Sequence, residues 1–125
     1  MKNKKLLMLS MVLLSLLLVA CGPTKESKFP TGKFIKVGEP NRALVFNEDG
    51  TFIVLEGSST LVSGTYSVDS DTYTDESNSQ NCPPMSFKYT FDGTNLTFNY
   101  LGKPADDPCL GRHADFNNVT YTLSK

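Results

Sequence analysis

The sequence predicts an all-β fold, a single small antiparallel meander of seven or eight strands, and three observations support it. Apolar and polar residues alternate over several short segments, as in strands with one buried face. Asp49-Gly50 and Asp92-Gly93 separate such segments, and Asp-Gly pairs favour hairpin turns. Between residues 32 and 125 no sustained helical period occurs. The meander is expected to close into a barrel, because closure removes exposed sheet edges.

The expected strands follow one another along the chain, and most are joined by short loops. Gly64 lies inside a strand-like run and predicts a bulge or a sharp bend. A short helix is expected over 110–116, before the last strand. The candidate segments for these seven or eight strands are 32–37, 43–46, 51–55, 60–63, 64–68, 72–75, 86–91, 96–100 and 119–123.

The N-terminal segment has the pattern of a secretory signal. Three lysines within the first five residues precede the apolar run Leu6–Ala20, which ends in small residues. That run is shorter than the roughly 20 residues that a membrane-spanning helix needs. Such a segment can be an ordinary signal peptide that happens to end near a cysteine, or a signal for attaching lipid to that cysteine.

The tetrad Leu18-Val19-Ala20-Cys21 resembles the lipobox of bacterial lipoproteins. In that family the cysteine thiol receives a diacylglycerol, and the chain is cut immediately before it. The resemblance implies a signal peptide over 1–20, lipidation of Cys21 and a location in the bacterial cell envelope. The acyl chains would hold the protein at the inner leaflet of the outer membrane or at the outer face of the cytoplasmic membrane.

Beyond the signal, the chain divides into a short tether and one domain. Residues 21–31 are polar and contain two prolines, as expected of a flexible tether that begins at the lipidated cysteine. Residues 32–125 form the β domain. Removing the signal removes three lysines and no acid, so the formal charge falls from −1 to −4. This balance argues against nucleic acid as a partner and against electrostatic adhesion to anionic lipid.

Two cysteines remain once the lipobox cysteine is set aside. Cys82 and Cys109 are an even pair in a compartment that permits disulfides. A bridge between them would close a loop of about 28 residues, worth roughly 3–4 kcal/mol. The alternative is a metal site built from both cysteines, His113 and an aspartate at 106 or 107, but it lacks the paired short spacing of structural zinc sites. We expect the disulfide, with no metal and no other cofactor.

Several short motifs in the domain together resemble the lipocalin-like superfamily of small bacterial lipoprotein domains. They are Gly32-Lys33-Phe34, Gly64-Thr65-Tyr66, Asp107-Pro108-Cys109-Leu110-Gly111-Arg112 and the last strand, Val119–Leu123. Lipocalins carry Gly-x-Trp in their first strand, and because this chain has no tryptophan, Phe34 would take that place. The resemblance implies a lipocalin-like barrel whose interior is filled by side chains or holds one small ligand.

The domain is short for a ligand-carrying barrel and rich in aromatic residues, which favours a filled interior. Arg112 is expected to cover an aromatic ring, such as that of Phe34, at one end of the barrel. If the barrel binds a small apolar ligand, the expected binding residues are Phe34, Phe52, Phe87, Tyr89, Phe98 and Arg112.

The sequence offers no evident catalytic constellation. His113 is the sole histidine, so a Ser-His or Cys-His scheme would depend on it, and we expect it on a polar surface turn. Asp69 and Asp71 are expected at a solvated hairpin tip rather than in a calcium loop. We therefore predict a monomeric, non-enzymatic envelope lipoprotein that binds a small apolar ligand. The alternative is a protein–protein interaction module or an inhibitor in the cell envelope.

Overall fold

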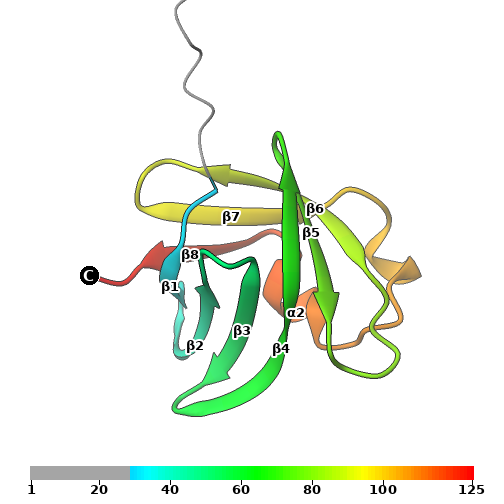
Figure 1. Cartoon of the computed structure of the whole chain (residues 1–125), viewed down its shortest axis with the longest axis horizontal. Helices are drawn as coiled ribbons and strands as arrows, with labels where there is room; N and C mark the ends of the chain where they lie inside the picture. The colour runs from blue at the N-terminus through cyan, green and yellow to red at the C-terminus, as the bar shows by residue number, and fades with distance from the viewer. Residues whose placement is uncertain (1–28) are drawn as a thin grey trace, which may run out of the picture.

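A computed structural model of the chain describes residues 29–125. Its strands form a closed antiparallel barrel in simple meander order (Figure 1). A 3₁₀ turn, η2 (Pro104–Asp106), and a short helix, α2 (Arg112–Phe116), lie in the connection before the last strand. The strands are β1 (Gly32–Lys36), β2 (Glu39–Phe46), β3 (Thr51–Glu56), β4 (Ser59–Asp69), β5 (Thr72–Ser77), β6 (Met85–Phe91), β7 (Asn95–Tyr100) and β8 (Val119–Leu123).

The predicted all-β class, the meander, its closure and the short helix before the last strand are confirmed. The predicted signal peptide over 1–20, the lipidated Cys21 and most of the predicted tether lie outside the described residues.

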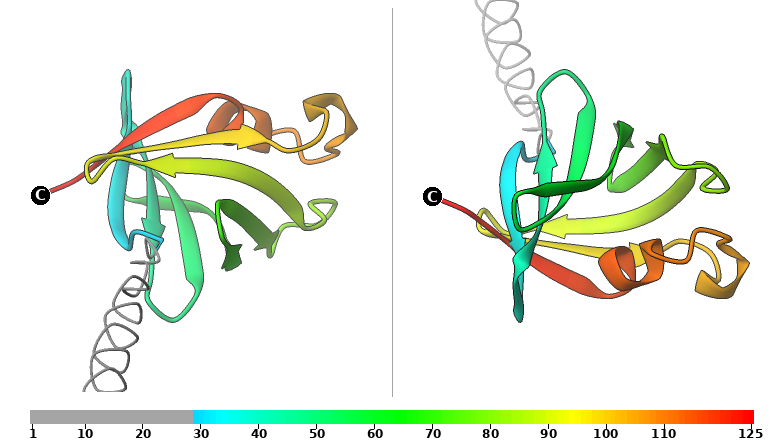
Figure 2. Two further views of the ribbon diagram at one scale, coloured as in Figure 1. Left: turned by 90° about the horizontal axis from the view of Figure 1, so that it is seen from above. Right: turned by 90° about the horizontal axis from the view of Figure 1, so that it is seen from below.

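Closure of the barrel depends on pairing between the first and the last strand. In the β1–β8 ladder, Phe34 lies opposite Leu123 and Lys36 lies opposite Tyr121. Every other pairing joins strands that are neighbours in the sequence, as can be followed from both sides of the barrel in Figure 2. Each strand of the barrel thus has a hydrogen-bonded neighbour on both sides, which limits edge-to-edge association with other chains.

Strand β4 differs from the expectation in two ways. It is one strand from Ser59 to Asp69, where the sequence pattern predicted two. The register irregularity lies between Val54 and Leu55 of the β3–β4 ladder rather than at Gly64. Gly64 instead marks a close approach, because a Cβ atom there would lie 2.8 Å from the Phe52 ring and closer still to the Glu76 carbonyl oxygen.

Aromatic and aliphatic side chains fill the barrel interior. Inward-facing positions of the strands alternate with outward ones, as a half-buried strand requires. Phe46 shows the density of the packing, since its ring lies 5.7 Å from that of Tyr73 and 6.2 Å from that of Phe98. The fully buried interior residues are Phe34, Leu44, Phe46, Phe52, Tyr73, Phe87, Leu96, Phe98, Phe116 and Tyr121.

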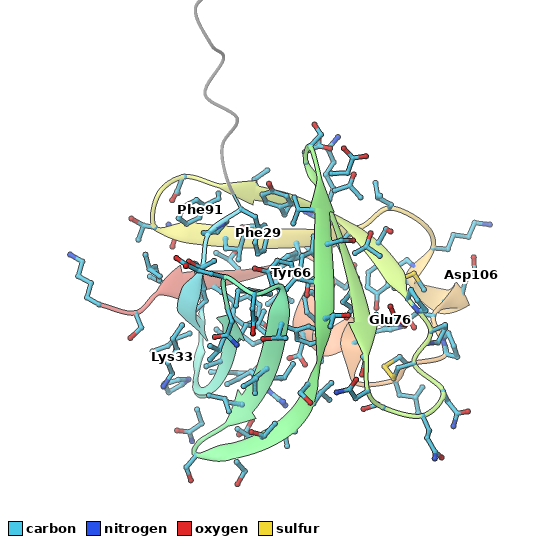
Figure 3. All side chains as sticks on the ribbon, viewed as in Figure 1. Phe29, Lys33, Tyr66, Glu76, Phe91 and Asp106 are labelled. Carbon is cyan, nitrogen blue, oxygen red and sulfur yellow. A yellow bond between two sulfur atoms is a disulfide. The ribbon has the colours of Figure 1, made fainter. Side chains whose placement is uncertain are left out.

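The folded part of the chain begins earlier than expected. Phe29, which we assigned to the tether, is 8% exposed and packs in one end of the barrel. Its ring centroid lies 4.9 Å from that of Tyr89 and 5.0 Å from that of Phe46, and Figure 3 places it near Tyr66 and Phe91. The predicted boundary at residue 31 is therefore corrected: Phe29 belongs to the core of the domain.

Candidate binding site at the disulfide-bonded end of the barrel

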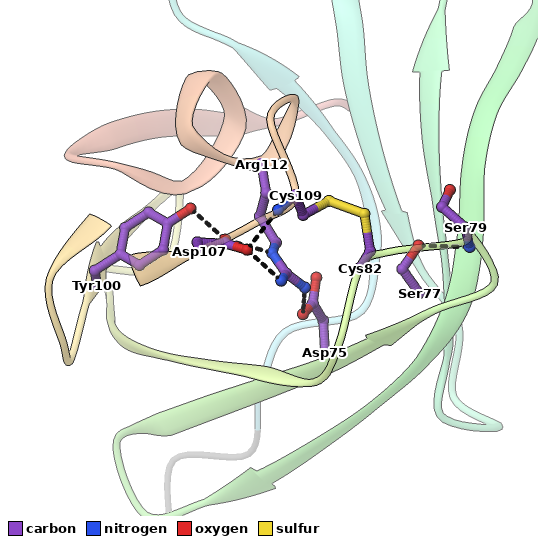
Figure 4. Close-up of a disulfide and its surroundings, with 8 residues drawn as sticks. All are labelled: Asp75, Ser77, Ser79, Cys82, Tyr100, Asp107, Cys109 and Arg112. Atoms are coloured by element: carbon purple, nitrogen blue, oxygen red, sulfur yellow. Dashed lines mark hydrogen bonds and ion pairs between the residues drawn. A yellow bond between two sulfur atoms is a disulfide. The ribbon is translucent and has the colours of Figure 1, made fainter. Parts of the chain in front are cut away.

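The disulfide Cys82–Cys109 joins the two longest loops of the domain at one end of the barrel (Figure 4). Cys82 lies between β5 and β6, and Cys109 lies between β7 and β8. The predicted bridge is confirmed. Because both sulfur atoms are used in it, neither cysteine can be a thiolate ligand, and the alternative zinc arrangement is wrong for this pair.

Next to the disulfide, Arg112 begins α2 and is 4% exposed. Its Nε donates to Asp107 Oδ2 at 2.7 Å and its Nη2 donates to Asp107 Oδ1 at 2.6 Å. Its Nη1 donates to Asp75 Oδ1 at 2.8 Å. The fork geometry suits a bidentate pair. Arg112 thus lies at one end of the barrel, and two carboxylates hold the guanidinium that was expected to cover an aromatic ring such as that of Phe34.

The two carboxylates of this triad respond in opposite ways to their surroundings. Burial raises the pKa of Asp75 to about 6, although Arg112 opposes that shift. Burial would also raise the pKa of Asp107. There, hydrogen bonds from Arg112, from the Cys109 backbone N–H (2.9 Å) and from the Tyr100 hydroxyl (2.8 Å) outweigh burial and lower the pKa to about 2. The triad therefore keeps Asp107 ionised and ties the β7–β8 connection to β5.

Beside the triad lies a cavity of about 350 Å³, which we call the end pocket. Its volume is within the range of small-molecule sites. Leu61 and Leu110, two of its lining residues, are 49% and 88% exposed. Its other apolar lining comes from Phe52, Val54, Val62, Ala114, Phe116 and the disulfide, and its charged lining from Arg42, Asp75, Arg112 and Asp115.

A second group of charges lies at the edge of the end pocket. Arg42 Nε is 3.2 Å from Glu56 Oε2 and 3.7 Å from Asp115 Oδ1. Lys36 Nζ donates to the Ala114 carbonyl oxygen at 2.8 Å and is 3.9 Å from Asp115 Oδ1. Burial raises the pKa of Asp115 against the opposing effect of both cations. These contacts fix the last turn of α2 against β1 and β2.

The structure brings together some of the residues expected to bind a ligand and separates others. Phe52 and Arg112 line the end pocket, whereas Tyr89 lines a groove at the opposite end. Phe34, Phe87 and Phe98 are fully buried in the filled interior. A ligand would therefore meet the ends of the barrel rather than its centre.

Sequence reasoning missed several lining residues of the end pocket. Phe116 and Val62 gave no signal of their own, because the loop and the hairpin that carry them meet only in the folded barrel. His113, expected on the surface, is half-buried and packs edge-on to Tyr100 with ring centroids 5.5 Å apart. Leu110, next to Cys109, could have indicated the pocket, because it is a large apolar residue in an otherwise polar loop.

Comparison with protein-family models, with curated proteins and with solved structures finds no match to this chain. The fold is thus assigned from the structure: a small, closed, eight-stranded antiparallel β-barrel. Within residues 29–125, none of the helices has the length and apolar character required to cross a bilayer.

Proposed function

We propose that this protein is a lipid-anchored, non-enzymatic lipoprotein of the bacterial cell envelope, and that its lipocalin-like barrel binds a small apolar ligand in the end pocket. The lipobox-like tetrad ending in Cys21 supports the anchor. The observation that carries the binding function is the end pocket itself, a concave site of about 350 Å³ with an apolar wall.

The composition of the end pocket favours an apolar ligand. Leu61 and Leu110 expose apolar surface at the pocket, and covering such surface is favourable by about 25 cal/mol per Å². The four charged lining residues already have oppositely charged neighbours within the domain. A ligand need not supply a charge to them, so apolar contact is the main source of affinity.

The frame of the end pocket is built to keep its shape. The disulfide fixes the loop that carries Leu110, and the Arg112 triad fixes that same connection to β5. A site that is ordered before binding loses less entropy when the ligand arrives. The rigidity of this end therefore supports a binding role.

The non-enzymatic part of the proposal rests on the position of His113. Its ring packs on Tyr100, and its Nε2 atom is buried without a hydrogen-bond partner among the described residues. A general base must reach the proton that it removes, directly or through one water. His113 is poorly placed for that task.

The binding proposal can be tested by titrating the purified protein with the neutral dye Nile red. Leu110→Asp places a charge at the end pocket and should weaken dye binding about tenfold, since apolar contact is lost and a carboxylate must be desolvated. Leu101→Asp is the matched control: Leu101 begins the same connection, is 54% exposed and lies outside the end pocket. Equal affinity of the two variants would contradict the proposal.

A protein–protein interaction module or inhibitor is the second candidate, and Leu110 favours it. Leu110, which is 88% exposed on a disulfide-bonded loop, and Leu61, which is 49% exposed, lie at the same pocket, and exposed apolar surface of this kind can mark a protein–protein contact. Pull-down with the anchored protein distinguishes the two: a stoichiometric partner lost in Leu110→Asp but kept in Leu101→Asp, without dye binding by the unmodified protein, selects this candidate.

A further inference from the structure

The end of the barrel opposite the disulfide has a groove of its own, which we call the mouth groove. It is open to solvent and has a volume of about 1070 Å³. Its walls come from Phe29, from the β2–β3 and β4–β5 turns and from the ends of β4 and β6. We propose that the mouth groove binds an organic cation with an apolar body, such as an arylammonium or alkylammonium compound. This proposal does not depend on the end pocket.

Aromatic rings form the apolar wall of the mouth groove. Phe29 lies 5.3 Å from Tyr66 and 4.9 Å from Tyr89, measured between ring centroids. Tyr66 and Phe91 are both half-buried, so part of each ring faces solvent. Figure 3 shows Phe29, Tyr66 and Phe91 gathered at this end. Aromatic faces attract cations electrostatically and also pack against an apolar body.

Hydrogen bonds hold the two tyrosines of this wall in place. The Tyr66 hydroxyl donates to the Asn47 carbonyl oxygen at 2.9 Å, and the Tyr89 hydroxyl donates to the Ser70 carbonyl oxygen at 3.1 Å. Each bond ties a ring to a hairpin turn at the rim of the groove. The aromatic wall is therefore positioned before any ligand arrives.

The charged residues of the mouth groove favour a positively charged ligand. Glu48, Asp69 and Asp71 line it, and within residues 29–125 no lysine, arginine or histidine does. Lys88 Nζ lies 2.9 Å from Asp71 Oδ2 and compensates that carboxylate. Within residues 29–125, Glu48 and Asp69 form no ion pair, and no described cation compensates their charge. An anionic ligand would meet uncompensated negative charge, whereas a cation is complementary to it.

A metal ion is a poor match for the same carboxylates. Within the described residues, no cluster of three or more aspartate, glutamate, histidine or cysteine side chains is compact enough to hold one. The aromatic wall offers a metal no ligand atoms, but it contacts an organic cation over a large area. The combination of rings and dispersed carboxylates therefore points to an organic ammonium group.

The test compares phenyltrimethylammonium with tert-butylbenzene, its neutral isostere, and with benzenesulfonate. Binding is followed by NMR shifts of the full protein at low ionic strength. We expect phenyltrimethylammonium to bind at least fivefold more tightly than either comparison compound and to shift the resonances of Tyr66 and Tyr89. Equal affinity for the cation and its isostere would overturn the proposal, as would shifts confined to the end pocket.

Paired variants test the role of the carboxylates. Glu48→Gln with Asp69→Asn should weaken cation binding about fivefold, because the substitutions remove two exposed negative charges that attract the ligand. Glu76→Gln with Asp106→Asn is the matched control, since both acids are exposed and lie outside the groove. An equal loss in both double variants would show a general charge effect and contradict the site. Leu110→Asp should leave cation binding unchanged.

Discussion

Arg112 contacts two carboxylates, that of Asp107 five residues away and that of Asp75 37 residues away, and all three groups are nearly inaccessible to water. A buried ion pair or triad often adds little net stability, whereas removal of one member costs several kcal/mol because the remaining charge is left uncompensated. The main role of the triad is therefore to hold the β7–β8 connection in one conformation, and its net contribution to stability is small. Because the pKa values of both carboxylates are shifted, the ion pairs of the triad depend on pH.

Asp107→Asn should change how stability depends on pH. The pKa of Asp107 is about 2 in the folded protein, below the ordinary value near 3.9 of the unfolded chain. Its ionised form thus contributes stability above pH 4, and this contribution is lost as pH falls through 2. Urea denaturation should show the variant to be about 2 kcal/mol less stable at pH 7. That difference should shrink toward zero between pH 4 and pH 2.

Asp106→Asn is the control for this experiment, because Asp106 is the adjacent acid and is exposed. Its stability should follow that of the unmodified protein over the whole pH range. A constant difference between Asp107→Asn and the unmodified protein from pH 7 to pH 2 would contradict the ionic origin of the effect.

At the scale of single elements, β4 contains a glycine that allows close packing inside the barrel. Gly64 lies opposite Phe52 on β3 and opposite Ser77 on β5, and no side chain separates it from the Phe52 ring. The Glu76 carbonyl oxygen and the Phe52 ring together fill the space that a Cβ atom would need. The long β4 strand can therefore pair with both neighbours and still accommodate a large ring in the interior.

Gly64→Ala should destabilise the domain by about 2–3 kcal/mol, because the added methyl group must displace the Phe52 ring and the backbone of β5. Gly102→Ala is the matched control, since a Cβ atom at Gly102 meets nothing within 4 Å. Thermal unfolding followed by circular dichroism compares the two. If Gly64→Ala melts together with Gly102→Ala, the close approach at Gly64 is refuted.

The elements differ in how far the sequence predicts them. Strands β6, β7 and β8 alternate strictly between aromatic or aliphatic and polar residues, so their bounds are predicted within one residue. Strand β4 lacks such alternation, because Gly64 takes an inward position where a large side chain would be expected. Phe29 stands alone among polar residues. Its burial depends on rings from β2, β4, β5 and β6 and has no local signal.

At the scale of the whole molecule, the barrel has two chemically different ends. The disulfide, α2 and a buried ionic triad form one end, and aromatic rings with exposed acids form the other. The disulfide was predictable because an even pair of cysteines that follows a signal-like segment favours a bridge. The Asp75–Arg112 contact was not predictable, since no spacing rule relates residues 37 positions apart. The sequence thus predicted the covalent part of the site but not its ionic part.

Cys82→Ser with Cys109→Ser should lower stability by about 3–4 kcal/mol, because the unfolded chain regains the entropy of the closed loop. The barrel should persist, since its strand pairings do not involve either cysteine. Urea denaturation is the measurement. The unmodified protein in reductant should match the double variant, and a variant as stable as the oxidised protein would contradict a stabilising bridge.

The ladder between β1 and β8 has a consequence for how the chain folds. All other strand pairings are local and can form as successive hairpins, whereas this one joins the two ends of the domain. Long-range pairings of this kind slow folding, because the entropy of closing a long loop is lost before the contacts are gained. Until β8 is present, β1 and β7 are open edges that can recruit other chains. Until β8 has paired, the chain stays exposed to aggregation through these edges, so we expect its folding to depend on a chaperone for that interval.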